Sequence, residues 1–280
     1  MASTNAMQPH EFERPVLELS GELLRAAMQV MVAGSEEHGG VERYIDAVKL
    51  KSTMFRQALV DNDIAKLDLD TFKGLCTFMA TVRRRISQWL NEESFEQMHA
   101  HIVELFRDEE HIDNRIGRFC DQFPNDTKHR WVRDRAAELL HNADPERVPL
   151  MTRWVWDARA NTGVIREIWH GENVDHIKIP VGDGYGTYLM LREELSQFLS
   201  ENGVFRDVLF YVDVLCAQIY ARYICEQGGS YLRADFSSPE DPMQHTRRLL
   251  GLDGVQPGDG RTRLKSIDGE AYRIDDSKLN

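Results

Sequence analysis

The sequence predicts a mainly α-helical protein: a single helical-bundle domain with a small β addition in the C-terminal third. Apolar residues recur three or four positions apart in several segments, which places one side of each helix against its neighbours. Alternating apolar residues, typical of strands, begin only after residue 173. We expect a polar tail over residues 1–14, a helical bundle over 15–173, and C-terminal helices with short strands over 174–280, packed on the bundle as one domain.

Each predicted helix is defined by its apolar spacing and by the residues at its ends. Helices are expected over residues 15–34, from there to about 59, and over 70–89, 91–123, 127–140, 146–169, 191–200, 204–226 and 243–250. Residues 174–180 alternate as a strand does, and Asp268-Gly269 lies between two alternating runs, as in a β-hairpin. We expect the core to include Phe72, Met79, Ile86, Phe95, Ile102, Ile116, Val208 and Val212.

Composition and charge narrow the classes of function. A formal net charge of −12 argues against a surface that binds the phosphate backbone of nucleic acid. No apolar run approaches the roughly 20 residues that cross a bilayer, and the N-terminus lacks the basic and apolar regions of a secretory signal. The four cysteines lie in helical patterns without CxxC spacing, which favours reduced thiols. We therefore expect a cytoplasmic protein without nucleic-acid or membrane partners; whether it forms a homo-oligomer is left open.

Three Glu-x-x-His pairs have the spacing that binds iron in carboxylate bundles, where both side chains face inward. They are Glu96/His99, Glu138/His141 and Glu167/His170. Glu96 points away from the apolar side of its helix, and the third pair lies off the apolar side of its own. We therefore interpret these as surface acid–His pairs. Zinc-finger spacing, HExxH and nucleotide-binding glycine motifs are absent from the sequence.

Two charged residues occupy apolar positions of the helical pattern. Lys51 occupies such a position between Val48 and Phe55, and Glu109 occupies another in the segment 91–123. A charge on a core-facing position must pair with an opposite charge or reach solvent. We expect one of these outcomes for both residues; the alternative is that Glu109 lines an interior pocket.

Aromatic and basic residues concentrate between Arg153 and His176. Aromatic walls with a few Arg and His donors suit a planar or carboxylate-bearing ligand. The candidate substrate-binding residues in this segment are Trp156, Arg159, Arg166 and His170. A Trp-rich core helix with a solvated Arg face is the competing interpretation.

A third segment, MQHTRRLLGLDGVQPGDG at residues 243–260, places a His on a short helix before Arg, Leu-Gly and a Gly-rich loop. It resembles the region around the haem-ligating His of tryptophan 2,3-dioxygenase-like enzymes, which are helical haem proteins. The resemblance covers fewer than twenty residues, and neither the glycine- and threonine-rich loop nor the distal-side motifs of that family are matched. It implies haem as cofactor and His245 as the axial metal ligand.

Two functions follow from these patterns. The first is a helical haem- or iron-dependent oxygenase, an oxidoreductase that holds iron at His245 and binds a small aromatic or carboxylate-bearing substrate through Arg159 or Arg166. The alternative is a non-enzymatic helical protein-interaction or regulatory module. Its contact surface would be the Trp-rich segment, because aromatic and Arg residues are the usual anchors of interfaces. The sequence singles out no catalytic residue for either function.

Overall fold

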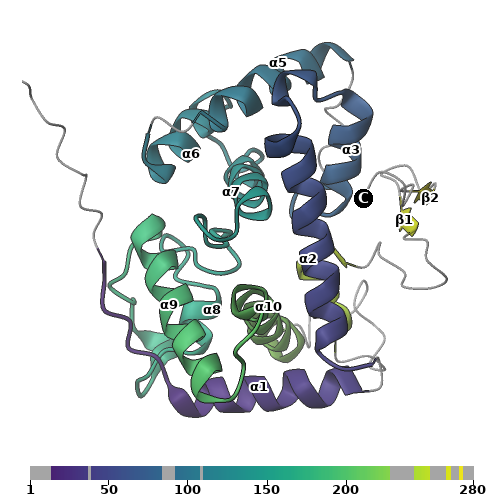
Figure 1. Ribbon diagram of the computed structural model, residues 1–280. Coiled ribbons are helices and arrows are strands. Elements are labelled where there is room, and N and C mark those ends of the chain that lie inside the picture. Colours follow the sequence, from purple (N-terminus) through teal and green to yellow (C-terminus); the bar gives the residue numbers. More distant parts are fainter. Residues whose placement is uncertain are drawn as a thin grey trace, which may run out of the picture.

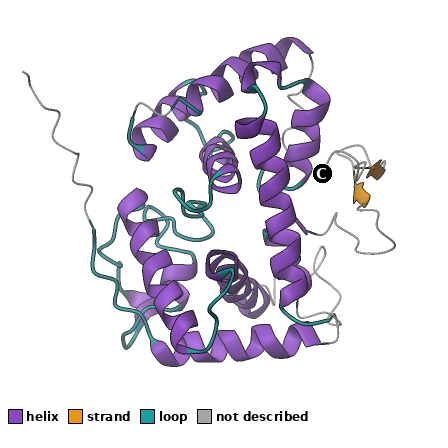
Figure 2. Cartoon of the chain, in the orientation of Figure 1, coloured by secondary structure: helices purple, strands orange, loops and turns teal. Residues whose placement is uncertain are grey.

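The computed structural model describes residues 14–36, 39–83, 92–107, 110–227, 243–252, 263–265 and 271–273. The described part is mainly helical (Figure 2), as the sequence predicted. The long helix α2 (Glu42–Arg56) joins two groups of helices (Figure 1). One group contains α3 (Leu69–Thr77), α5 (Glu92–Leu105) and α6 (Ile112–Asp121), and the other contains α1 (Gly21–Glu36), α9 (Tyr185–Glu201) and α10 (Val208–Gln227).

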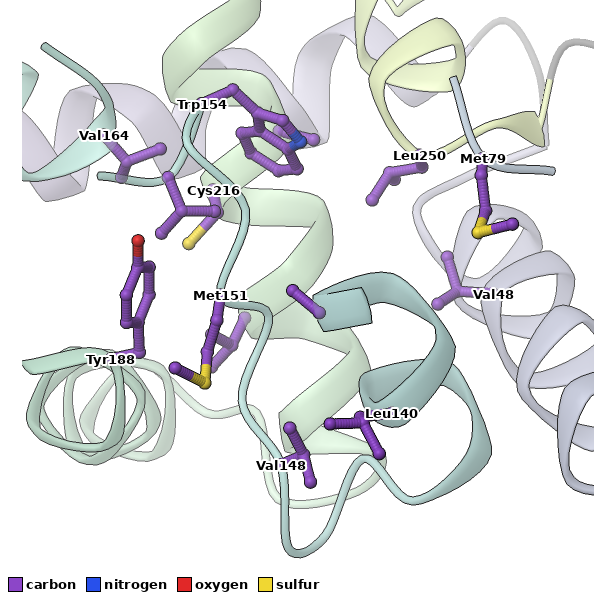
Figure 3. Packing of buried hydrophobic residues seen from close by; sticks show 14 of the residues in the cluster. Val48, Met79, Leu140, Val148, Met151, Trp154, Val164, Tyr188, Cys216 and Leu250 are labelled. Atoms are coloured by element: carbon purple, nitrogen blue, oxygen red, sulfur yellow. The ribbon is translucent and has the colours of Figure 1, made fainter. Parts of the chain in front are cut away.

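Two central helices hold the groups together. Helix α10 packs against α1, α2, α9, α8 (Val164–Glu167) and α11 (Gln244–Leu249), while α7 (Trp131–Ala143) packs against α2 and α6. Their buried hydrophobic residues belong to one connected cluster, part of which Figure 3 shows. The expected core residues Phe72, Met79, Phe95, Ile102, Ile116 and Val212 are buried, and Val208 is half-buried. Ile86 lies outside the described residues.

Helix α10 is long and apolar enough to cross a bilayer by length and composition alone, over Val208–Glu226. This corrects the expectation that no run of the chain approaches that length. Half of the window is buried against the rest of the protein, and α10 contacts five other helices. A helix that is apolar on all sides is found in the core of a large protein as well as in a membrane, so we interpret α10 as a core helix.

The segment predicted as one long helix over 91–123 is two helices, α5 and α6. The buried side chain of Arg115 donates a hydrogen bond of 2.8 Å from Nε to the carbonyl of Leu105, the last residue of α5. His111 caps the start of α6 by accepting a hydrogen bond from the amide of Asp113 at its Nδ1. These two contacts satisfy helix-end groups that a continuous helix would satisfy internally. Glu109, in the connection, lies outside the described residues.

The region from 146 to 169, predicted as a helix, consists mainly of turns and contains only the short α8. Gly163 adopts a φ of +124°, and a Cβ there would lie 2.6 Å from the carbonyl oxygen of Val155. Asn161, also at positive φ, bonds through its side chain to the carbonyl of Ile177 and the amide of Ile179. Side-chain hydrogen bonds of this kind compete with helix formation, and apolar spacing does not reveal them.

The predicted β addition is not supported. Residues 174–180 were expected to form a strand, but Val174–His176 form the 3₁₀ turn η3, and the residues after it pair with no strand. In the described part of the C-terminal region, two three-residue segments, β1 (Arg263–Lys265) and β2 (Ala271–Arg273), pair antiparallel. No other named strand occurs among the described residues.

Close backbone packing joins the end of α3 to the segment after α11. The Asp68 side chain caps α3 by accepting a hydrogen bond from the amide of Thr71. The helix ends at Thr77, and Gly251 packs against the next residue, Phe78. Gly251 has a φ of +72°, and a Cβ on it would lie 1.8 Å from the Phe78 carbonyl oxygen. Only glycine fits this position without a backbone shift.

Candidate ligand groove and the adjacent buried polar network

The largest concavity that we describe is a groove between α1, the start of α2 and the loop from α9 to α10. Its volume is about 650 Å³, which is within the usual range for ligand pockets. Figure 1 shows α1 crossing the lower end of the molecule, where α2 begins and near α10. The turn before α2 contains Gly39 and Gly40, both at positive φ, which allow the chain to reverse between α1 and α2.

The groove has an apolar floor and an acidic rim. Met31, Val41 and Ile45 are buried beneath it. Four carboxylates and one guanidinium line it; they belong to Glu36, Glu42, Asp46, Asp207 and Arg206. A cavity of this composition favours a ligand that is both apolar and positively charged.

Phe205 is the most unusual residue of the groove. Its side chain is 78% exposed although it lies beside an apolar floor. The helix predicted over residues 204–226 includes Phe205, but α10 begins only at Val208. Because Phe205 lies in the preceding loop, it is not directed into the core by helical periodicity. A large exposed aromatic side chain at a groove is typical of a contact residue.

The loop that carries Phe205 is fixed by an ion pair. Asp207 has a φ of +54°, a conformation that non-glycine residues rarely adopt. The ammonium group of Lys49 on α2 lies 3.0 Å from both carboxylate oxygens of Asp207. Positive φ outside glycine is found often at functional sites, where the surroundings hold it in place. Here the exposed Lys49–Asp207 pair connects the loop to α2.

Two residues further along α2, Lys51 is part of a buried polar network. Its Nζ lies 3.8 Å from Oε2 of Glu138 on α7 and donates a hydrogen bond of 2.9 Å to the carbonyl of Leu250. Thr81 donates a hydrogen bond of 2.7 Å to the other oxygen of Glu138. Burial lowers the pKa of Lys51, opposed mainly by Glu138, and burial raises the pKa of Glu138, opposed mainly by Lys51. The expectation that Lys51 pairs with an opposite charge is confirmed.

His141 and Asp213 extend the network to α10. His141 Nδ1 lies 2.8 Å from the carbonyl of Val148, and Nε2 lies 3.0 Å from a carboxylate oxygen of Asp213. A carbonyl only accepts hydrogen bonds, so Nδ1 carries a hydrogen, and Nε2 and Asp213 share one further proton. Both ring nitrogens are therefore occupied by protein groups, which leaves none for a substrate.

The network has no space for a substrate. Its two cavities measure about 10 Å³ beside Lys51 and about 20 Å³ beside His141, room for roughly one water molecule each. Both members of Glu138/His141 are buried, so the interpretation of that pair as a surface pair was wrong. The periodicity argument failed because α7 is buried on nearly all sides. The network thus places ionisable groups inside the core, where they pair with one another.

The four predicted binding residues differ in their burial and in their contacts. Trp156 is fully buried, and its Nε1 donates to the carbonyl of Val181. Arg159 and His170 are exposed, and Arg166 donates to the carbonyl of Asn161. None of them lines the groove or the two small cavities. Trp154, Trp156 and Trp169, the aromatic residues of the Trp-rich segment, are all buried.

His245, the predicted metal ligand, is buried on α11 and lines none of these three cavities. Within the described ranges, no group of three or more His, Cys, Asp or Glu residues is arranged to hold a metal ion. An iron site built from such a group is therefore not supported. Haem bound by His245 alone stays a prediction. It can be tested by comparing the visible absorption spectra of the wild-type protein and of His245→Ala, both expressed with ample haem.

Sequence reasoning missed the groove because its residues come from three separated segments. Met28, Met31, Ile45 and Tyr211 follow helical patterns that also describe a core. The available signal was the loop Asn202–Asp207, where an aromatic residue lies among Asn, Gly, Arg and Asp. No family model matches the chain, and neither a curated protein nor a solved structure matches it.

Proposed function

We propose that this protein is a helical binding module whose groove, formed by α1, α2 and the α9–α10 loop, takes a basic amphipathic segment of a partner protein. The observation that carries the proposal is Phe205, 78% exposed at an apolar groove with an acidic rim. An amphipathic helix lays its apolar face into such a groove, while its Lys or Arg residues meet the carboxylates of the rim.

Two features favour a polypeptide segment over a small molecule. Apolar surface continues beyond the floor of the groove, because Val32 on α1 is 42% exposed. Met28 and Met31 line the groove, and methionine side chains adapt to varied partner surfaces. A wide groove with adaptable walls and charges at the edge suits a helical segment whose charged residues remain near solvent.

A labelled amphipathic peptide of leucine and lysine tests the proposal by fluorescence anisotropy. We expect it to bind, and we expect Phe205→Ala to weaken binding about tenfold, the effect of losing ~1.4 kcal/mol from one aromatic anchor. The pair Glu36→Gln and Asp46→Asn should weaken binding at low salt more than at high salt, because salt screens exposed charges.

Matched control variants distinguish binding at this groove from non-specific binding of the peptide. Ile177 is exposed and lies outside the groove, and so does the surface acid Glu194. Ile177→Ala and Glu194→Gln should bind the peptide as wild type does. The proposal is wrong if these controls lose as much affinity as the groove variants, or if a peptide with glutamate in place of lysine binds equally well.

A further inference from the structure

Arg135 lies on the buried helix α7, and its side chain forms no hydrogen bond with the residues that the structure describes. It is 0% exposed and is among the largest fully buried side chains of the described chain. Its three nitrogens, Nε, Nη1 and Nη2, are inaccessible to solvent, and none forms a hydrogen bond in the structure. A guanidinium has five N–H donors and stays protonated at neutral pH. Leaving a buried charge without an acceptor is strongly unfavourable.

Aromatic rings surround this guanidinium. Its Cζ lies 4.6 Å from the ring centroid of Trp131 and 5.2 Å from those of both Phe119 and Phe123. Cation–π contacts offset part of the desolvation of the charge, but they provide no acceptor for the N–H groups. Burial lowers the pKa of Arg135 to about 10, opposed by the thiols Cys76 and Cys120. The group is therefore still charged near pH 7.

The residues that cover Arg135 lead toward the surface. Phe123, Cys120 and His101 are each half-buried. The rings of His101 and Phe123 meet edge to face, with centroids 5.9 Å apart, and the positive charge of Arg135 helps to lower the pKa of His101 after the larger effect of burial. The buried guanidinium thus contacts or influences side chains that are themselves partly exposed.

We propose that Arg135 is the anchor of a binding site for a small monocarboxylate with an apolar or aromatic body. A carboxylate accepts two parallel hydrogen bonds from a guanidinium. Among the described residues, Arg135 is the one cation in contact with the aromatic cage formed by the rings of Trp131, Phe119 and Phe123, so a ligand with a single negative charge matches the site better than a phosphate dianion does. The ring walls of the cage favour an apolar body next to that carboxylate. The site is separate from the groove, and neither proposal depends on the other.

Thermal unfolding with a panel of acetate, benzoate, phenylacetate and indole-3-acetate tests the assignment. We expect at least one aromatic monocarboxylate to raise the unfolding temperature of the wild-type protein in a saturable way, because a ligand that binds only the native state stabilises it. Benzamide, a neutral analogue of benzoate, should have no effect. Arg135→Met should weaken binding at least tenfold, and Arg222→Met, at an exposed arginine of α10, should leave it unchanged.

The unliganded variants add a second readout. If Arg135 binds an external anion and has no partner in the free protein, unliganded Arg135→Met should unfold at the same temperature as wild type or a higher one. The substitution removes a buried charge that has no acceptor. If a carboxylate of the chain itself pairs with Arg135 in solution, Arg135→Met should be destabilised. The added carboxylates should then not bind, and this result would overturn the proposal. An equal response of wild type and Arg135→Met to every carboxylate would overturn it too.

Discussion

The buried pair Lys51–Glu138 makes a quantitative prediction: removing one partner should destabilise the protein more than removing both. In Lys51→Met, Glu138 would keep only the hydrogen bond from Thr81 and would be a buried carboxylate without its cation. Breaking a buried ion pair in this way costs ~3–5 kcal/mol, a large part of the ~5–15 kcal/mol that stabilises a typical domain. In the double variant with Glu138→Gln no charge is left unpaired, so we expect a free energy of unfolding within about 1 kcal/mol of wild type.

The pH dependence of the single variant gives an independent check. Lys51 opposes the upward shift of the Glu138 pKa, so Lys51→Met should raise that pKa further. The folded state then holds a proton on Glu138 that the unfolded state releases above the ordinary glutamate pKa of 4.5. The free energy of unfolding of Lys51→Met should therefore fall as pH rises from about 4.5 to the folded-state pKa. Towards acidic pH the penalty relative to wild type should shrink.

Urea unfolding followed by circular dichroism, at several pH values, measures these free energies. Lys49→Met is the matched control, since Lys49 forms an ion pair with Asp207 in which both side chains are more than one third exposed. Such surface pairs contribute ~0–1 kcal/mol. The reasoning fails if Lys51→Met costs no more than Lys49→Met, or if the effects of Lys51→Met and Glu138→Gln simply add in the double variant.

Three further predictions follow from packing and burial. Gly251→Ala should destabilise the protein by more than ~2 kcal/mol in urea unfolding, because its Cβ would overlap the Phe78 carbonyl oxygen at a positive φ; a loss below ~0.5 kcal/mol would show that the backbone adjusts freely. Asp213→Ala should cost ~1–3 kcal/mol in the same measurement by leaving Nε2 of buried His141 without its partner, and an unchanged midpoint would refute that contact. In a thiol-reagent titration, all four cysteines should be free and exposed Cys225 should react first, with the rest reacting fully only after denaturation; a count of two or fewer would indicate disulfides.

Helical periodicity predicted the core well where a helix has one buried side. Phe72, Ile102 and Val212 are buried as expected, and Lys51 lies inside the core with an opposite charge beside it. In these helices the 3.6-residue repeat and the burial pattern carry the same information. The class of fold could therefore be read from sequence alone.

Periodicity could not predict where side chains interrupt helices. Arg115 ends α5 by donating a hydrogen bond to the Leu105 carbonyl. The Asn161 side chain bonds to the backbone of Ile177 and Ile179, where a neighbouring strand would bond in a sheet. Both contacts join residues ten or more positions apart through a single side-chain group. Apolar spacing continues across such points, so the sequence suggested continuous elements at 91–123 and 146–169.

The candidate sites were missed for a different reason. Arg135, Glu138 and His141 lie on α7, where charged residues would ordinarily mark a solvent-facing side. Because α7 is enclosed by its neighbours, these charges are buried as well. The groove residue Phe205 was predicted to belong to a helix, but it lies in the loop before α10, which begins three positions later.

The enclosure of α7 also has a consequence for the motions of the chain. Twelve of its 13 residues are buried, from Trp131 to Ala143, so this helix has no solvent-facing side on which its amides could exchange by local fluctuation. Its amide hydrogens should be replaced by deuterium only when the surrounding helices separate, and their exchange then reports the global unfolding free energy. The helix that holds both the aromatic cage and the Lys51–Glu138 pair would thus be the last part of the molecule to open.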